Sequence, residues 1–104
     1  MKKISIIIPH KNSSQKLERL LKSIPKNNLF ETIVIDDNSN DNELQHIKDL
    51  CQTFDIQLYI NHKKNGAGGA RNLGLQKSTG DWVLFADADD FFTPNMEDIV
   101  KHYI

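Results

Sequence analysis

Three aspartates directly follow the apolar run 82–86: Asp87, Asp89 and Asp90, with Ala88 between the first two. The run is typical of a buried strand, so the carboxylates stand where that strand leaves its sheet. Carboxylates this close repel one another unless a cation joins them. Mg²⁺ or Mn²⁺ is commonly held by one or two carboxylates, with substrate phosphates completing the shell. The group therefore favours a metal-bridged phosphate ligand. A structural alternative is that Asp89 caps the following turn and Asp90 is merely solvated.

A second acidic group, Asp-Asp-Asn-Ser-Asn-Asp at 36–41, follows the apolar residues 33–35. A carboxylate here can accept hydrogen bonds from a base N–H or a ribose hydroxyl. Ser39 or Asp41 would satisfy the first N–H groups of the next helix. Ordinary loop chemistry explains 38–40 well, but it explains two adjacent acids less well, because they repel each other. We expect Asp37 to contact a ligand, and Asp36 either to do the same or to brace the loop.

A glycine-rich segment, Gly-Ala-Gly-Gly-Ala-Arg at 66–71, looks at first like a phosphate loop. A dinucleotide-binding fingerprint needs Gly where Arg71 stands and should follow the first strand, and no Gly-Lys-Ser/Thr ending is present. We therefore expect a flexible turn that presents Arg71. Its planar fork suits a phosphate or a carboxylate. The residue either braces the Asp36–Asp37 pair or contacts a diphosphate.

The elements that must position these groups alternate along the chain. Short apolar runs predict strands, and segments of helical periodicity between them predict helices. Four βα units with short connections predict one domain over 1–104, a three-layer α/β fold with a parallel sheet and right-handed crossovers. We expect strands at 4–8 (closed by Pro9), 32–36, 56–60 and 82–86, and helices at 15–24 (capped by Ser13 or Ser14), 41–54, about 66–77, and from Thr93-Pro94 to His102.

In such a sheet, ligands bind beyond the carboxyl ends of the strands. All four predicted strands end in polar residues, so these residues should gather at one edge of the sheet. A ligand cleft explains four polar endings better than four unrelated loops do. The endings are 9–12 (Pro-His-Lys-Asn), 36–41, 61–71 and 87–90.

Composition excludes several classes. The chain has 104 residues and a formal net charge of −1, so it has no overall basic field for a nucleic acid or an anionic membrane surface. The apolar runs are far shorter than a membrane helix, and 1–3 lead into a run too short for a signal peptide. We expect a cytoplasmic protein, attached to a membrane only through other segments or partners. The lone Cys51 is expected to be a small apolar filler.

The polar strand endings resemble those of family 2 glycosyltransferases, in the same order and over almost the whole chain. This resemblance implies a Rossmann-like GT-A fold with strand order 3-2-1-4, a nucleotide-diphospho-sugar donor (best matched by a UDP-sugar) and Mn²⁺ or Mg²⁺ bound through a D-x-D motif. The matching segments are Ser5-Ile6-Ile7-Ile8-Pro9 with Asn12, Ile33-Val34-Ile35-Asp36-Asp37-Asn38-Ser39 with Asp41, Asn65-Gly66, Ala70-Arg71-Asn72-Leu73-Gly74, Gly80-Asp81 and Phe85-Ala86-Asp87-Ala88-Asp89-Asp90.

The resemblance implies roles for the first two strand ends. Pro9, His10 and Asn12 resemble the strand end that meets the base or ribose. Asp37 resembles the uracil-binding Asp of the family, and Asp36 is similar to its companion. The chain departs from the family at 10–11 (His-Lys), where members often carry an aromatic residue just before the Asn. Base stacking is therefore not expected there.

The resemblance also implies roles around the D-x-D motif. Arg71 is similar to the Arg near the base and diphosphate. Asp87 and Ala88 resemble the ribose side of the motif, and Asp89 resembles the direct metal ligand, with Asp87 as a second candidate ligand. No catalytic residue is assigned, because the base and the acceptor surface of inverting members come from a C-terminal half.

We therefore expect a nucleotide-binding half-domain of a longer protein, or a gene fragment. The full-length protein would transfer sugar to a saccharide or lipid-linked acceptor, and the isolated chain would bind nucleotide weakly and turn over little. The fourth strand would be an exposed apolar edge that favours self-association.

Other classes stay open at this stage. A haloacid-dehalogenase-type phosphatase would use Asp87 as nucleophile and Asp89 as acid, although its motif normally follows the first strand. A phosphate-accepting receiver domain needs more strands than this length supplies. A catalytically silent α/β interaction module would use the sheet edge and bind no metal.

Overall fold

The computed structural model describes residues 3–63 and 66–103. Strands and helices alternate throughout, as the apolar periodicity predicts. The elements are β1 (Ile4–His10), α1 (Ser14–Ser23), β2 (Phe30–Asp36), α2 (Asp41–Thr53), β3 (Gln57–Ile60), α3 (Gly66–Lys77), β4 (Trp82–Phe85) and α4 (Met96–Tyr103).

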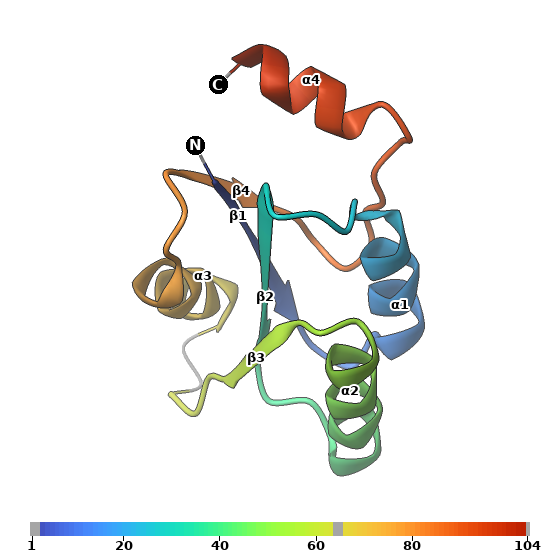
Figure 1. The fold of residues 1–104 in the computed structure, drawn as a ribbon. Coiled ribbons are helices and arrows are strands. Elements are labelled where there is room, and N and C mark those ends of the chain that lie inside the picture. Colours follow the sequence, from blue (N-terminus) through green and yellow to red (C-terminus); the bar gives the residue numbers. More distant parts are fainter. Residues whose placement is uncertain (1–2, 64–65, 104) are drawn as a thin grey trace.

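The four strands form one parallel sheet in the order β3-β2-β1-β4, which confirms the expected α/β class and strand order. Helices α1 and α2 lie on one side of the sheet and α3 on the other, so the expected three layers are present (Figure 1). Strand β1 is central and pairs with β2 over its whole length, from Ile4 opposite Phe30 to His10 opposite Asp36. Strand β4 is an edge strand.

The core has two parts because the sheet is covered on both faces. Side chains of a strand alternate between faces: Ile6 and Ile8 pack with residues of α1 and α2, whereas Ile7 packs with Ala70 of α3. This arrangement explains why the strands are continuous apolar runs. Gly74 lets α3 approach closely, since a Cβ at this position would overlap the side chain of Ile7.

Strand β1 continues through Pro9 and His10, so the expectation that Pro9 closes the strand was wrong. The carbonyl of Ile7 accepts from Ala86 N on the β4 side, and the carbonyl of His10 accepts from Asp37 N on the β2 side. By alternation, the nitrogen of Pro9 faces the side on which β4 has already ended. A strand tolerates proline where no ladder partner is available.

Two helix starts differ from expectation. Ser13 occupies the N-cap position of α1, but its side chain makes no cap hydrogen bond. The N–H of Ser14 donates instead to Glu43 of α2, at 3.1 Å. Helix α4 starts at Met96, after Pro94, so the proline precedes the helix. Helix α3 starts at Gly66, as expected, so Arg71 is presented from within a helix and the expectation of a flexible turn was wrong.

Among the residues described, no helix is long and apolar enough to cross a membrane.

Candidate functional site

The carboxyl ends of β1, β2 and β3 are joined side by side by backbone hydrogen bonds. Asp37 N donates to His10 O, and Asn61 N donates to Asp36 O, both at 2.8 Å. The ladder therefore continues one residue beyond β2 and β3 and holds the three endings in register. The expected gathering of polar residues at this sheet edge is present for these strands.

Asp36 is buried within the protein at 1% exposure, although it carries a carboxylate. Ser39 donates to it twice, from its hydroxyl at 2.5 Å and from its N–H at 3.1 Å, and the ring of His10 lies 3.4 Å away. Burial acts to raise the pKa of Asp36, but the hydrogen bonds from His10 and Ser39 outweigh it and hold this pKa below its ordinary value. The carboxylate therefore braces its loop from inside.

The loop after β1 is tied to the loop after β2 by Asn12. Its N–H donates to Ser39 Oγ, and its Oδ1 accepts from the N–H of Asn40, both at 2.9 Å. Asn12 has φ 50°, in the left-handed region that Asn tolerates better than most residues. The cap of α2 is Asn40, whose side chain accepts from Glu43 N. The expected caps, Ser39 and Asp41, were wrong, because the hydroxyl of Ser39 is used by Asp36 and Asn12.

Asp37 differs from its neighbour in being only partly buried. Its Oδ1 accepts from the side-chain amides of Asn38, at 3.1 Å, and Asn61, at 3.4 Å. Asn38 has φ 63°, so the chain turns sharply just after the acid. This places one carboxylate, flanked by amides, at the surface of the sheet edge.

The acids after β4 are exposed. The side chains of Asp87 and Asp89 are 67% and 72% accessible, whereas Ala88 between them is packed into the core. Any ligand contact of Ala88 would therefore use its backbone. Asp90 closes the turn: its carboxylate accepts from Asp87 N at 3.1 Å, and its N–H donates to Asp87 O. Asp90 is therefore hydrogen-bonded within the turn 87–90 and is not merely solvated, as the structural alternative expected.

Asp87 and Asp89 each have a cationic side chain beside the carboxylate. Arg71 Nη2 lies 3.6 Å from Asp87 Oδ1, and Lys16 Nζ lies 3.0 Å from Asp89 Oδ1. Arg19 donates to the backbone carbonyl of Asp89 at 2.8 Å, and its guanidinium stacks on the ring of Phe91. Arg71 therefore lies against the acids after β4, and the expected alternative in which it braces Asp36 and Asp37 was wrong.

The exposed acids suit a hard divalent cation in the nature of their donor atoms. Two carboxylates separated by one residue offer oxygen ligands at the sheet edge. Among residues 3–63 and 66–103, no group of three or more His, Cys, Asp or Glu side chains could hold a metal alone. A metal here would need oxygens from a ligand such as a diphosphate.

Sequence reasoning missed Lys16 and Arg19, and it placed Asn61 in the polar ending of the third strand without assigning it a contact. The two cations lie one helical turn apart on α1, a spacing that also occurs on ordinary solvated helix faces. Only the fold brings that face to the loop after β4. Lys64 and Asn65, the latter part of the expected Asn-Gly motif, lie outside the described residues.

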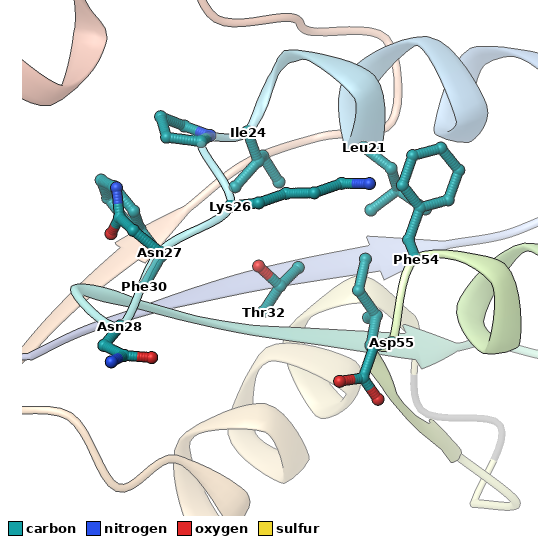
Figure 2. Close-up of a pocket in the computed structure, with 11 residues that line it drawn as sticks. Leu21, Ile24, Lys26, Asn27, Asn28, Phe30, Thr32, Phe54 and Asp55 are labelled. Atoms are coloured by element: carbon teal, nitrogen blue, oxygen red, sulfur yellow. The ribbon is translucent and has the colours of Figure 1, made fainter.

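A pocket of about 390 Å³ lies at the opposite end of the sheet, among the end of α1, the start of β2 and the segment between α2 and β3. Figure 2 shows the side chain of Lys26 extending across this pocket toward Phe54, and the ammonium lies 4.8 Å from the ring centre. The pocket holds none of the predicted site residues. Cys51 is also remote from the site, and burial raises the pKa of its thiol to about 11, so it stays protonated.

A family model described as glycosyl transferase family 2 matches residues 5–104. The poly(ribitol-phosphate) β-N-acetylglucosaminyltransferase TarS of Staphylococcus aureus is 33% identical over 96 residues, which cover 88% of this chain and 17% of TarS. The crystal structure of TarS 1–349 in complex with UDP-GlcNAc superposes with a TM-score of 0.82 at 30% identity, over 98% of this chain and 31% of that one.

A Campylobacter jejuni GalNAc(5)-diNAcBac-PP-undecaprenol β-1,3-glucosyltransferase is 37% identical over 94 residues, which cover 86% of this chain and 30% of that enzyme. The fold is also shared by a mannosyltransferase from Pyrobaculum calidifontis solved with GDP-Man and Mn²⁺, with a TM-score of 0.80 at 23% identity over 94% of this chain and 30% of that one. The chain thus spans less than a third of the length of these relatives. The matches favour the glycosyltransferase interpretation over the phosphatase.

Proposed function

The chain belongs to glycosyl transferase family 2, and from that premise we propose that its polar sheet edge binds the nucleotide part of a nucleotide-diphospho-sugar. The proposal rests on one observation: the acids at the sheet edge are of two kinds. Asp37 is a partly buried carboxylate flanked by amides, whereas Asp87 and Asp89 are exposed carboxylates beside cations. The first suits a nucleoside and the second a metal with a diphosphate.

At the nucleoside end, Asp37 accepts a hydrogen bond from a base N–H, which suits uracil. The ring of His10 and the carboxylate of Asp36 are buried, so they support the site without touching the ligand. The backbone of Pro9 and His10 borders the ligand. Structures of TarS with UDP and with UDP-GlcNAc, at 30% identity, support a UDP-sugar as the donor.

At the diphosphate end, Asp89 and then Asp87 would hold Mn²⁺ or Mg²⁺. The metal supplies charge neutralisation for the leaving nucleoside diphosphate. Arg71 lies beside Asp87 and can donate to a diphosphate oxygen through its remaining N–H groups. Lys16 must release Asp89 before that carboxylate can bind a metal through the same oxygen.

For the protein as a whole we propose metal-dependent, inverting transfer of sugar to an acceptor hydroxyl of a saccharide or lipid-linked substrate. We assign the catalytic base to none of the described residues. The isolated chain is accordingly expected to bind donor with little or no turnover.

The test is thermal unfolding with UDP, GDP, CDP or ADP, each with and without Mn²⁺, because a ligand that binds only the folded state raises its stability. We expect the largest rise in Tm with UDP plus Mn²⁺. Asp89→Ala should lose the metal-dependent part. Asp98→Ala, which removes an exposed acid from α4, is the matched control and should behave as wild type. No shift with any nucleotide at millimolar concentration would favour the silent interaction module.

We also propose that the outer edge of β4 pairs with a second copy of this chain where no other polypeptide covers it. Strand β4 neighbours only β1 in the described sheet, and Val83 and Phe85 are 38% and 44% exposed. Run 82–86 contains neither the lysine nor the proline that commonly protects an edge.

This self-association should appear as a concentration-dependent mass in light scattering. Val83→Lys should return the chain to a monomer, because a charge on the edge strand opposes pairing. Ile99→Lys makes the same change at an exposed position of α4 and should leave the association intact. A monomeric mass for the wild type at high concentration would contradict the proposal.

A further inference from the structure

The ring of His10 is buried at the edge of the proposed nucleotide site, with the whole residue only 3% exposed. Resting on the proposed function, we infer that His10 is a positioning residue: its neutral imidazole, protonated on Nδ1, locks the β1 and β2 endings together and so holds Asp37 in place for the nucleoside.

The hydrogen bonds determine where the proton lies. The backbone N–H of Ser13 points at His10 Nε2, with the nitrogens 2.9 Å apart. A backbone N–H can only donate, so Nε2 must carry the lone pair. The single ring proton of the neutral imidazole is then on Nδ1, which faces Asp36 Oδ1 at 3.4 Å. Both ring nitrogens are thus used inside the protein, and neither is left for a ligand.

Asp36 passes this restraint to the neighbouring loop. Its carboxylate accepts from His10 on one side and from the hydroxyl and N–H of Ser39 on the other. Ser39 Oγ in turn accepts from the N–H of Asn12, whose side chain accepts from Asn40. One continuous set of hydrogen bonds therefore crosses between the two loops, and every group in it has a defined donor or acceptor role.

Asp37 directly follows the end of β2, at the junction of these bonds. Its N–H donates to the carbonyl of His10, and the carbonyl of Asp36 accepts from the N–H of Asn61. These two bonds hold the peptide unit that joins Asp36 to Asp37, one from the β1 side and one from the β3 side. The backbone that leads into Asp37 is thereby restrained, which leaves its side chain as the freer part. Loss of the His10–Asp36 contact would release Asp36 and loosen the position of Asp37, although no atom of the His10 ring would touch the ligand.

Three substitutions separate this role from packing. The amide nitrogen of Asn stands near the place of Nδ1, so His10→Asn keeps a donor for Asp36 and loses the acceptor for Ser13. The amide oxygen of Gln stands near the place of Nε2, so His10→Gln keeps the acceptor for Ser13 and loses the donor. His10→Ala removes both. Phe30→Leu is the control, because it weakens the core at the far end of the sheet.

The readouts are the UDP dissociation constant with Mn²⁺, below the unfolding temperature of every variant, and the ¹⁵N chemical shifts of the His10 ring in the wild type. We expect shifts typical of a protonated Nδ1 and an unprotonated Nε2. We expect binding about tenfold weaker in His10→Ala and His10→Gln, within about threefold of wild type in His10→Asn, and unchanged in Phe30→Leu.

Several outcomes would overturn the inference. Reversed ring shifts would refute the assigned tautomer. If wild type binds UDP and His10→Ala binds equally well, the positioning role fails while the proposed function stands. Equal weakening in Phe30→Leu would reduce the role of His10 to general stability. If wild type binds no nucleotide, the proposed function itself fails and the inference fails with it.

Discussion

Two acidic groups of similar sequence are used in opposite ways. The β2 acidic pair, Asp36 and Asp37, ends an inner strand, and its first member is buried among donors. The β4 acidic cluster, Asp87, Asp89 and Asp90, ends an edge strand, and the first two of its acids are exposed beside cations. Each group follows an apolar run directly, so sequence proximity to a strand did not distinguish them.

The two acidic groups differ in exposure because different elements flank the ends of β2 and β4. Strand β2 lies between β1 and β3, so its end is covered on both sides. The ring of His10 from β1 lies beside the Asp36 carboxylate, the N–H of Asn61 after β3 donates to the Asp36 carbonyl, and Ser39 of the following loop supplies the hydroxyl and N–H donors. Within the part of the chain that the structure describes, β4 has a strand neighbour on one side only, and its acids are approached mainly by side chains of α1 and α3. A buried carboxylate with fixed donors stabilises the fold, whereas an exposed carboxylate with flexible cations is available to a metal.

The largest expected difference is in stability. Asp36→Ala should lower the free energy of unfolding by about 3 kcal/mol, because it leaves buried donors of His10 and Ser39 without an acceptor. Asp87→Ala should change it by no more than about 0.5 kcal/mol, since its ion pair is exposed. Urea unfolding at neutral pH measures both. Equal losses would show that the two groups do not differ in the way their burial indicates.

Lowering the pH should also distinguish the two acidic groups, with an effect of intermediate size on stability. The folded-state pKa of Asp36 lies below its unfolded value of about 3.9. Its contribution to stability is therefore complete above the unfolded pKa and is lost as pH falls through the folded pKa. We therefore expect the free energy of unfolding, measured with urea, to fall less steeply between pH 5 and pH 3 in Asp36→Asn than in wild type.

Phe30→Leu serves as the control for this acid experiment, because it lowers stability without changing a titrating group. The decrease in its free energy of unfolding between pH 5 and pH 3 should equal that of wild type. Part of the loss should remain in Asp36→Asn, since the hydrogen bond from Ser14 also lowers the pKa of Glu43. An unchanged slope in Asp36→Asn would show that the buried carboxylate is not the acid-sensitive group.

The smallest effect concerns the β4 acidic cluster. Lys16→Met removes the ammonium 3.0 Å from Asp89 and should change stability by less than about 0.5 kcal/mol. Because Lys16 and a metal compete for the same oxygen, the apparent affinity for Mn²⁺ in the presence of UDP should rise about twofold. Lys22→Met, on the same helix but paired with Glu18, is the control. Weaker binding in Lys16→Met would instead indicate that Lys16 contacts the nucleotide.

Much of the fold followed from periodicity. Apolar runs covered on both faces identified the strands, and the helical spacing of apolar residues in α1 and α2 identified the helices that cover them. The errors occurred where a single residue type was taken as a boundary. Pro9 stayed inside β1 because its nitrogen needs no partner there, and Pro94 lies before α4 instead of occupying its first turn.

The candidate site was predictable in its location and less so in its detail. Parallel strands have their carboxyl ends on one side, so the strand endings alone located the polar edge. The burial of Asp36 and His10, the use of Arg71 by Asp87, and the approach of Lys16 to Asp89 depend on side chains from distant segments. Contacts between segments far apart in the chain cannot be predicted from the local sequence around each residue.

The sequence by itself determined the alternation of elements, the α/β class and the side of the sheet on which its chemistry lies, because hydrophobic period and chain direction are local properties. The tertiary structure alone decided which carboxylates became internal braces and which stayed exposed beside cations. Solvation and hydrogen-bond partners determine how a carboxylate behaves, and both were set here by strand order and by the helices packed against each strand end.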